Sequence, residues 1–209
     1  MDVVGISRIL TSADVEAAYR AGIFPMADPD RGIITWHRPK QRAILPLDSF
    51  HVSRSLSALL RRRPFEITWD QCFAAVMDAC ADRPSELGTW ISPEFKTIYR
   101  ELHRQGKAHS VEVLVDGELA GGLYGVQLGG AFFAESMFHR RTNMSKVALA
   151  ELVSQLRARG FSLLDVQYLT EHLAQFGVIE ISDKKYQARL KEALRLPCDF
   201  GSSILGSEV

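Results

Sequence analysis

The chain has 209 residues, enough for one large domain or two small ones, and its hydrophobic and charged fractions are those of an ordinary globular protein. Its 25 basic and 25 acidic residues balance, which argues against a protein that coats nucleic acid by bulk charge but leaves room for a local basic patch. We expect no transmembrane helix and no signal peptide, because no long apolar run is present. Three cysteines without a Cys-x-x-Cys motif indicate buried thiols in a reducing cytoplasm.

Residues 1–52 predict a small α+β domain of their own. A helix is expected over 11–22, because Thr11 and Asp14 form a capping box at its start. Two short strands are expected over 33–36 and 42–46.

Residues 53–197 predict a mixed sheet with helices on both faces. The expected helices cover 52–63, 70–81, 92–106, 143–159, 170–177 and 183–196, with Ser92, Asn143 and Thr170 as N-caps. The expected strands cover 65–68, 110–115, 118–128, 131–138 and 161–167. A meander followed by a crossover helix into a parallel strand is the outline of an N-acetyltransferase-like (GNAT) fold, an α+β arrangement. We expect the tail, 198–209, to be loose.

One carboxylate interrupts an apolar strand. Regular alternation places Phe133, Glu135 and Met137 on one face of the strand 131–138. Burying an unpaired carboxylate is costly, so Glu135 is either a strand-end group in solvent or a site carboxylate that binds a cation in an apolar pocket.

A second polar pair ends the strand 161–167. Asp165 and Gln167 are two residues apart and therefore share a face at the strand end, where α/β sheets open into ligand crevices. An acid and an amide there can orient a nucleophilic amine. The alternative is an aspartate that caps the following segment.

Three further features leave two interpretations each. The glycines 121, 122 and 125 within one strand indicate either a bulge or a ligand close to the backbone. Trp36 and Trp90 lie in loop-like contexts and either stack on a base or pack against the core. The cluster of Arg54 and residues 61–63 either holds RNA phosphates or is a solvated helix end. No metal-binding spacing, nucleophile elbow or phosphate-binding loop is present, and we expect no cofactor.

Taken together, several stretches resemble the leucyl/phenylalanyl-tRNA–protein transferase family. The resemblance covers roughly residues 5 to 195. It is carried by Ala18-Tyr19-Arg20-Ala21-Gly22-Ile23-Phe24-Pro25-Met26, Thr89-Trp90-Ile91, Tyr99, Ala108-His109-Ser110-Val111-Glu112, Gly121-Gly122-Leu123-Tyr124-Gly125, Glu135-Ser136-Met137-Phe138, Ser145-Lys146-Val147-Ala148-Leu149, Asp165-Val166-Gln167 and His172-Leu173.

This resemblance implies a cytoplasmic enzyme that moves leucine or phenylalanine from aminoacyl-tRNA to the N-terminal amine of proteins beginning with Arg or Lys, marking them for degradation through the N-degron pathway. It also implies a small N-terminal domain beside an acetyltransferase-like one. The site residues that it implies are Asp165 and Gln167 as the catalytic pair, Glu135 as the site acid, Trp36, Trp90 and Tyr99 near the terminal adenosine, Leu123, Phe132 and Met137 around the amino-acid side chain, and Ser145 as a further substrate contact. We expect a monomer without metal or cofactor.

The chain departs from the family pattern at four positions. Trp36 is followed by His37 where many members have a second tryptophan, so stacking there depends on Trp36 alone. Val166 replaces a cysteine, Ala134 replaces the glycine before Glu135, and Val178 replaces an alanine. None of these changes removes a predicted polar site residue.

The implied chemistry needs little from the protein. The donor is an activated ester, and the acceptor α-amine, with a pKa of about 7.7–8.0, is already about one tenth neutral near pH 7. Orientation and proton removal therefore suffice.

Two other classes of function compete. Acetyl transfer from coenzyme A needs a glycine-rich turn before the long helix, whereas residues 140–144 contain no glycine. A non-catalytic binder of RNA ends has no need of Asp165 and Gln167.

Overall fold

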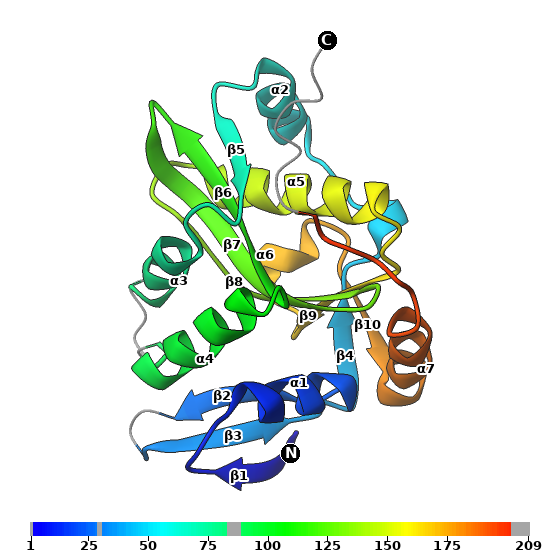
Figure 1. Cartoon of the computed structure of the whole chain (residues 1–209). Helices are drawn as coiled ribbons and strands as arrows, with labels where there is room; N and C mark the ends of the chain where they lie inside the picture. Colours follow the sequence, from blue (N-terminus) through cyan, green and yellow to red (C-terminus); the bar gives the residue numbers. More distant parts are fainter. Residues whose placement is uncertain (1, 29–30, 83–88, 202–209) are drawn as a thin grey trace.

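The computed structural model describes residues 2–28, 31–82 and 89–201, which form two β-sheets surrounded by helices (Figure 1). The smaller sheet has the strand order β1-β3-β2, with β1 Val3–Ser7, β2 Phe24–Asp28 and β3 Ile33–His37. The larger sheet has the order β10-β4-β9-β8-β7-β6-β5, with β4 Gln41–Ile44, β5 Glu66–Trp69, β6 Ala108–Val115, β7 Glu118–Leu128, β8 Ala131–His139, β9 Leu163–Gln167 and β10 Ile179–Ser182. Within the described part of the chain, no helix is long and apolar enough to cross a membrane.

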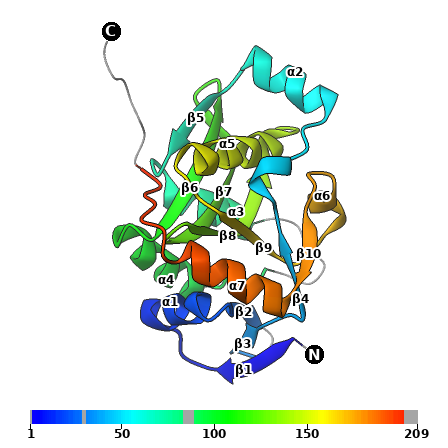
Figure 2. The ribbon, with the colours of Figure 1, turned by 90° about the vertical axis from the view of Figure 1, so that its right-hand side faces the viewer.

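Helices cover both faces of the larger sheet, as the sequence predicts (Figures 1 and 2). One hydrophobic core joins that sheet to α3 and α4, and a second core lies under α5. The helices are α1 Ser12–Arg20, α2 Arg54–Arg62, α3 Phe73–Ala81, α4 Pro93–Arg104, α5 Met144–Ala158, α6 Glu171–Ala174 and α7 Asp183–Ala193, with a 3₁₀ turn at Leu47–Ser49.

The predicted helix starts are mostly confirmed. Thr11 and Asp14 form the expected capping box, in which the Asp14 amide donates to the Thr11 hydroxyl at 3.1 Å. Ser92 and Thr170 also cap their helices through their side chains. Asn143 is the exception: it precedes α5 in a left-handed conformation, with φ of 69°, and makes no side-chain cap. Its predicted N-cap position is therefore confirmed, but the capping hydrogen bond of its side chain is absent.

The mixed sheet is confirmed as well. Strands β5 to β8 form an antiparallel meander, and α5 crosses over so that β9 runs parallel to β8. The turn at Asp116 and Gly117 has positive φ angles of 55° and 77°, as a type I′ hairpin requires.

Three strands differ from the sequence prediction. β1, β2 and β10 are not expected from the pattern, and Pro25 argues against β2 in particular. β2 accommodates this proline because it is an edge strand of the small sheet, where a missing N–H leaves no partner unpaired.

The N-terminal part of the chain reaches into both sheets. The small sheet ends at His37, whereas β4 pairs with β9 and β10 in the larger sheet. The division into domains at residue 52 stays a prediction, and we propose to move the boundary to the segment between His37 and Gln41.

A β-bulge changes the faces of β8. Tyr124 pairs with Ser136 and Gly125 pairs with Ala134, so Glu135 is an extra residue with no direct partner. The predicted alternation is therefore wrong: Phe133 joins the core under α3 and α4, whereas Met137 packs against the core under α5.

The glycines of β7 have structural explanations. A Cβ at Gly125, opposite the bulge, would lie 2.3 Å from the Phe133 carbonyl oxygen, and one at Gly121 would lie 2.5 Å from the Met144 Cβ. Of the two interpretations, close packing at a bulge and against α5 explains them without a ligand.

The end of the chain is packed up to residue 201. Phe200 is fully buried, its amide donates to the Gln127 side chain at 3.0 Å, and its ring stacks on His109 and Phe132. The expectation of a loose tail is wrong for residues 198–201, because an aromatic anchor holds them on the sheet; residues 202–209 lie outside the described residues.

Candidate active site

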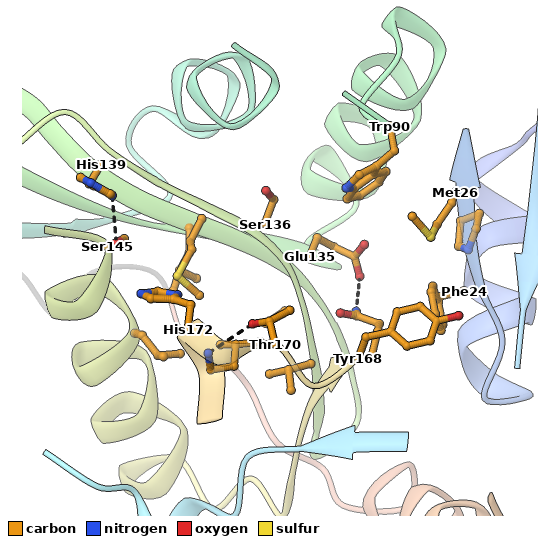
Figure 3. A pocket seen from close by; sticks show the side chains of 18 residues that line it. Phe24, Met26, Trp90, Glu135, Ser136, His139, Ser145, Tyr168, Thr170 and His172 are labelled. Atoms are coloured by element: carbon orange, nitrogen blue, oxygen red, sulfur yellow. Dashed lines mark hydrogen bonds between the residues drawn. The ribbon is translucent and has the colours of Figure 1, made fainter. Parts of the chain in front are cut away.

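A cavity of about 500 Å³ opens where β8 and β9 separate (Figure 3). Their parallel pairing ends at Phe133 and Asp165, and the bulge at Glu135 follows directly. The walls come from β2, β7, β8, β9, α5, α6 and the segment before α4. They comprise Phe24, Pro25, Met26, Trp90, Leu123, Ala134, Glu135, Ser136, Met137, His139, Ser145, Leu149, Val166, Gln167, Tyr168, Thr170, His172 and Leu173.

Glu135 is the only carboxylate among these lining residues. Tyr19 donates to its Oε1 at 2.6 Å, and Tyr99 donates to its Oε2 at 3.2 Å. Burial nevertheless raises the pKa of Glu135 to about 7, and the nearby Asp165 adds to this rise, while the tyrosine hydrogen bonds oppose it. The group therefore changes charge near neutral pH.

Gln167 contacts Glu135 from the neighbouring strand, β9. Its Nε2 donates to Oε1 of Glu135 at 3.1 Å, a contact drawn as a dashed line in Figure 3. The backbone of Gln167 has φ of 59°, a left-handed conformation that is unfavourable for a residue other than glycine. A strained conformation next to a cavity is a typical feature of a functional site.

Asp165 lies behind the cavity and does not line it. Its side chain is fully buried and accepts from Arg42, from the Tyr186 hydroxyl at 2.6 Å and from the Gln167 amide at 2.9 Å. The last contact is the capping interaction that the sequence left open as an alternative. Asp165 therefore supports Gln167 and does not touch the contents of the cavity.

Sequence comparison identifies the family. The sequence profile of the leucyl/phenylalanyl-tRNA protein transferases matches residues 44–191, and the profile of their N-terminal domain matches residues 9–40. The transferase of Salinibacter ruber is 54% identical over 183 residues, which are 88% of this chain and 80% of that one. The chain belongs to this family.

Other relatives agree with the assignment. The leucyl/phenylalanyl-tRNA–protein transferase of Gloeobacter violaceus is 52% identical over 88% of this chain and 93% of its own length. That of Roseobacter denitrificans is 52% identical over 91% of this chain and 90% of its own length. Among solved structures, a ribosomal-protein-alanine N-acetyltransferase of Brucella melitensis biovar Abortus 2308 has a TM-score of 0.37 at 16% identity over 69% of this chain and 97% of that chain.

Most of the residues predicted for the transferase site lie in the cavity wall. These residues are Trp90, Leu123, Glu135, Met137, Ser145 and Gln167. Ser145 lies in the first turn of α5, with its hydroxyl oxygen 3.4 Å from Nδ1 of His139, and forms one polar end of the wall.

Three predicted substrate contacts do not line the cavity. Trp36 lies in the small sheet and donates from Nε1 to the Ser7 hydroxyl at 3.0 Å. Tyr99 is fully buried and acts on the cavity only through Glu135. Phe132 is fully buried in the core under α5, on the regularly paired part of β8 before the bulge.

The cavity also contains residues to which the sequence analysis assigned no role. Met26 and Trp90 lie near each other at one side of the cavity, with Phe24 and Tyr168 on the same side (Figure 3). Tyr19, which holds Glu135, belongs to the same N-terminal motif as Phe24 and Met26. That motif was the feature of the sequence that could have indicated these residues. Its own residues do not show that β2 lines the site.

No metal site is found among the described residues: no three His, Cys, Asp or Glu side chains there are grouped so as to hold an ion.

Proposed function

We propose that this chain transfers leucine or phenylalanine from aminoacyl-tRNA to the N-terminal amine of cytoplasmic proteins that begin with Arg or Lys, and so marks them for degradation. The observation that carries the proposal is a single carboxylate, Glu135, at the bulge of a mostly apolar cavity in a member of this family. We expect the chain to act as a monomer.

The apolar part of the cavity suits the donor amino acid. Leu123, Met137 and Leu149 form a wall that accepts a leucine or phenylalanine side chain and rejects a charged one, because a charge would be desolvated there without a partner. Separating leucine from phenylalanine is harder for such a wall, which agrees with dual specificity.

Trp90 and Met26 offer a place for the terminal adenosine. They come from different parts of the chain and lie near each other at one side of the cavity (Figure 3). A base between an indole ring and a thioether gains stacking energy, typically about 1–3 kcal/mol for a base on an aromatic side chain.

Glu135 suits the acceptor. An N-terminal Arg or Lys carries a positive side chain and a positive α-ammonium group, and a carboxylate in a partly buried site attracts both. Because the pKa of Glu135 is about 7, close to that of an α-ammonium, this carboxylate can also take up the proton that the amine must lose.

The transfer itself then balances without a cofactor. The neutral amine nitrogen attacks the ester carbonyl carbon, a C–N bond forms, and the C–O bond to the ribose breaks. The proton from the amine is transferred to the departing ribose oxygen. Gln167 orients the amine through its carboxamide, and Asp165 acts only through Gln167.

The decisive experiment measures transfer of radiolabelled leucine from leucyl-tRNA to a peptide that begins with Arg. We expect one leucine on each modified peptide and none on a matched peptide with an acetylated N-terminus. Binding of aminoacyl-tRNA without transfer would support an RNA-end binder instead, and acetylation of the peptide from acetyl-coenzyme A would support an ordinary acetyltransferase.

A further inference from the structure

A buried arginine lies directly behind the cavity. Arg42, on β4, is 1% exposed and forms a fork on Asp165, with its Nη2 2.7 Å from Oδ2 and its Nε 2.9 Å from Oδ1. The Tyr186 hydroxyl, from α7, donates to the same carboxylate. A charge that is buried this deeply is kept only with a partner of good geometry, and the fork provides it.

The same guanidinium contacts the N-terminal part of the chain. Its Nη1 donates to the Gly22 carbonyl oxygen at 3.2 Å, and its central carbon lies 4.4 Å from the centre of the Phe24 ring. Phe24 is a wall of the cavity. Arg42 therefore joins β9 to the segment that leads into β2.

The contacts continue from Asp165 to the reacting groups. Oδ1 of Asp165 accepts the backbone amide of Gln167, whose left-handed conformation directs its side chain to Glu135. Without an acceptor at that point, the backbone of Gln167 would relax toward a negative φ and its carboxamide would leave Glu135.

We propose that Arg42 is a positioning residue for the transfer reaction: it fixes Asp165, and through it Gln167 and Glu135, while it holds the Phe24 wall in place. This inference depends on the proposed transfer activity. It assigns to Arg42 an effect on the rate of transfer that is separate from its effect on stability.

The charges around Glu135 make this role measurable. The groups that face it are Tyr19 from α1, Tyr99 from α4, Gln167 and Asp165 from β9, and Arg42 from β4. Asp165 raises the pKa of Glu135 and Arg42 lowers it. If transfer needs the ionised carboxylate, the acid limb of the pH profile should move up in Arg42→Gln and down in Asp165→Asn, by about 0.5 to 1 pH unit each.

The experiment measures kcat and KM of the full chain with leucyl-tRNA and an Arg-starting peptide between pH 5.5 and 9. Arg42→Lys keeps the charge but loses the fork. We expect it to lower kcat by about 10- to 100-fold, more than it raises KM for aminoacyl-tRNA, and to leave the acid limb where it is. Arg42→Gln and Asp165→Asn should show the opposite shifts.

The double variant Arg42→Gln/Asp165→Asn is the control for misfolding of the single variants. It removes both charges and leaves neither buried alone, so its acid limb should lie between those of the two single variants. Arg38→Gln is the matched control, because Arg38 forms a similar fork on Asp183, at 3.0 and 2.8 Å, away from the cavity wall. Its kcat and acid limb should equal those of the unmodified chain.

Unchanged kcat in Arg42→Lys overturns the inference, as do acid limbs that fail to move in opposite directions. Loss of the fold in Arg42→Lys assigns Arg42 a purely structural role and also overturns it. Absence of transfer by the unmodified chain would instead overturn the proposed function, together with everything that depends on it.

Discussion

Among single residues, Glu135 has a pKa on which two influences act in opposite directions. Tyr19, Tyr99 and Gln167 all donate to its carboxylate, and these contacts favour the charged form. Burial outweighs them, because the bulge directs the group into a mostly apolar cavity instead of toward solvent. The protein therefore maintains a carboxylate that is ready to exchange a proton near pH 7.

This raised pKa predicts how stability depends on pH. A carboxyl group whose pKa rises from 4.5 to about 7 on folding stabilises the folded state below pH 4.5, and this contribution is lost as the pH rises through about 7. Compared with Glu135→Gln, the unmodified chain should lose up to about 3 kcal/mol of unfolding free energy between pH 4.5 and 8. Urea denaturation of both proteins across this range measures the difference. Parallel pH dependences would show that Glu135 keeps an ordinary pKa.

The acceptor specificity is a second property of Glu135. Peptides that begin with Arg or Lys should be used, and those that begin with Ala or Glu should not. A peptide that begins with Ala forgoes the charge-assisted hydrogen bond to Glu135, worth about 1.5–3 kcal/mol, and a peptide that begins with Glu adds repulsion. Glu135→Gln should reduce this preference more than it reduces the affinity for aminoacyl-tRNA. Competition among the four peptides checks it, and equal use of all four by the unmodified chain would contradict it.

Met137 tests the donor side of the cavity. Met137→Asp should abolish the use of leucyl and phenylalanyl donors, because the new charge would be desolvated against an apolar side chain. Met137→Leu is the control, since it keeps the volume and polarity of the wall and should retain most activity. Single-turnover transfer with both donors measures the effect. Normal donor use by a folded Met137→Asp protein would place this residue outside the donor pocket.

At the scale of elements, the bulge in β8 decides the composition of the site. By adding one residue, it leaves Phe132 in the core, moves Met137 to the face of α5 and exposes Glu135 to the cavity. The same strand with regular pairing would present a different set of side chains. The helix α2 packs Leu56 against the core under α5 and presents Arg61 and Arg62 to solvent. Arg63, which follows α2, is also exposed and pairs with Glu151 of α5 at 3.5 Å.

If α2 holds the body of the tRNA, its free charges should contribute to salt-dependent binding. Changing Arg61 and Arg62 to Gln should lower the slope of log affinity against log salt by about 0.7 to 0.9 for each phosphate that is no longer neutralised. Lys184 and Lys191, which are also exposed, provide a charge-matched control, because they belong to α7, a helix that lies away from α2 in Figures 1 and 2. Filter binding of leucyl-tRNA at several salt concentrations measures the slopes. Equal slopes for both double variants would assign the cluster to solubility.

At the scale of the whole molecule, segments distant in the chain complete both the site and the core. The site needs β2 from the small sheet beside β8 and β9 of the large one, and the core needs the segment around Phe200 to close it. Residues near both ends of the chain therefore pack against the large sheet.

The anchoring role of Phe200 can be measured. Phe200→Ala should lower the unfolding free energy by about 3–5 kcal/mol, because a fully buried ring leaves a cavity against Trp69, His109 and Phe132. Ile9→Ala, at a 75% exposed apolar position, should change it by less than about 0.5 kcal/mol. Thermal or urea unfolding compares the two. A small effect at Phe200 would mean that the C-terminal segment contributes little to the core.

Features that depend on neighbouring residues follow from the amino-acid sequence alone. The capping box at Thr11 and the turn at Asp116 were predictable because their hydrogen bonds and backbone angles involve residues at most a few positions apart. The strand-end pattern indicated Gln167, and the resemblance to the family added Leu123, Met137 and Ser145, which also line the cavity.

The remaining features depend on contacts that form only in the folded molecule. The pairing of Arg42 with Asp165 joins residues 123 positions apart, and no local pattern specifies it. Trp36 lies outside the site and Met26 lines it because of how the small sheet packs against the large one. The bulge at Glu135 places the side chains after it on the opposite face from the one that strict alternation predicts. The physical reason is the same in each case: these positions are set by contacts between distant segments, whose energies no short stretch of sequence contains.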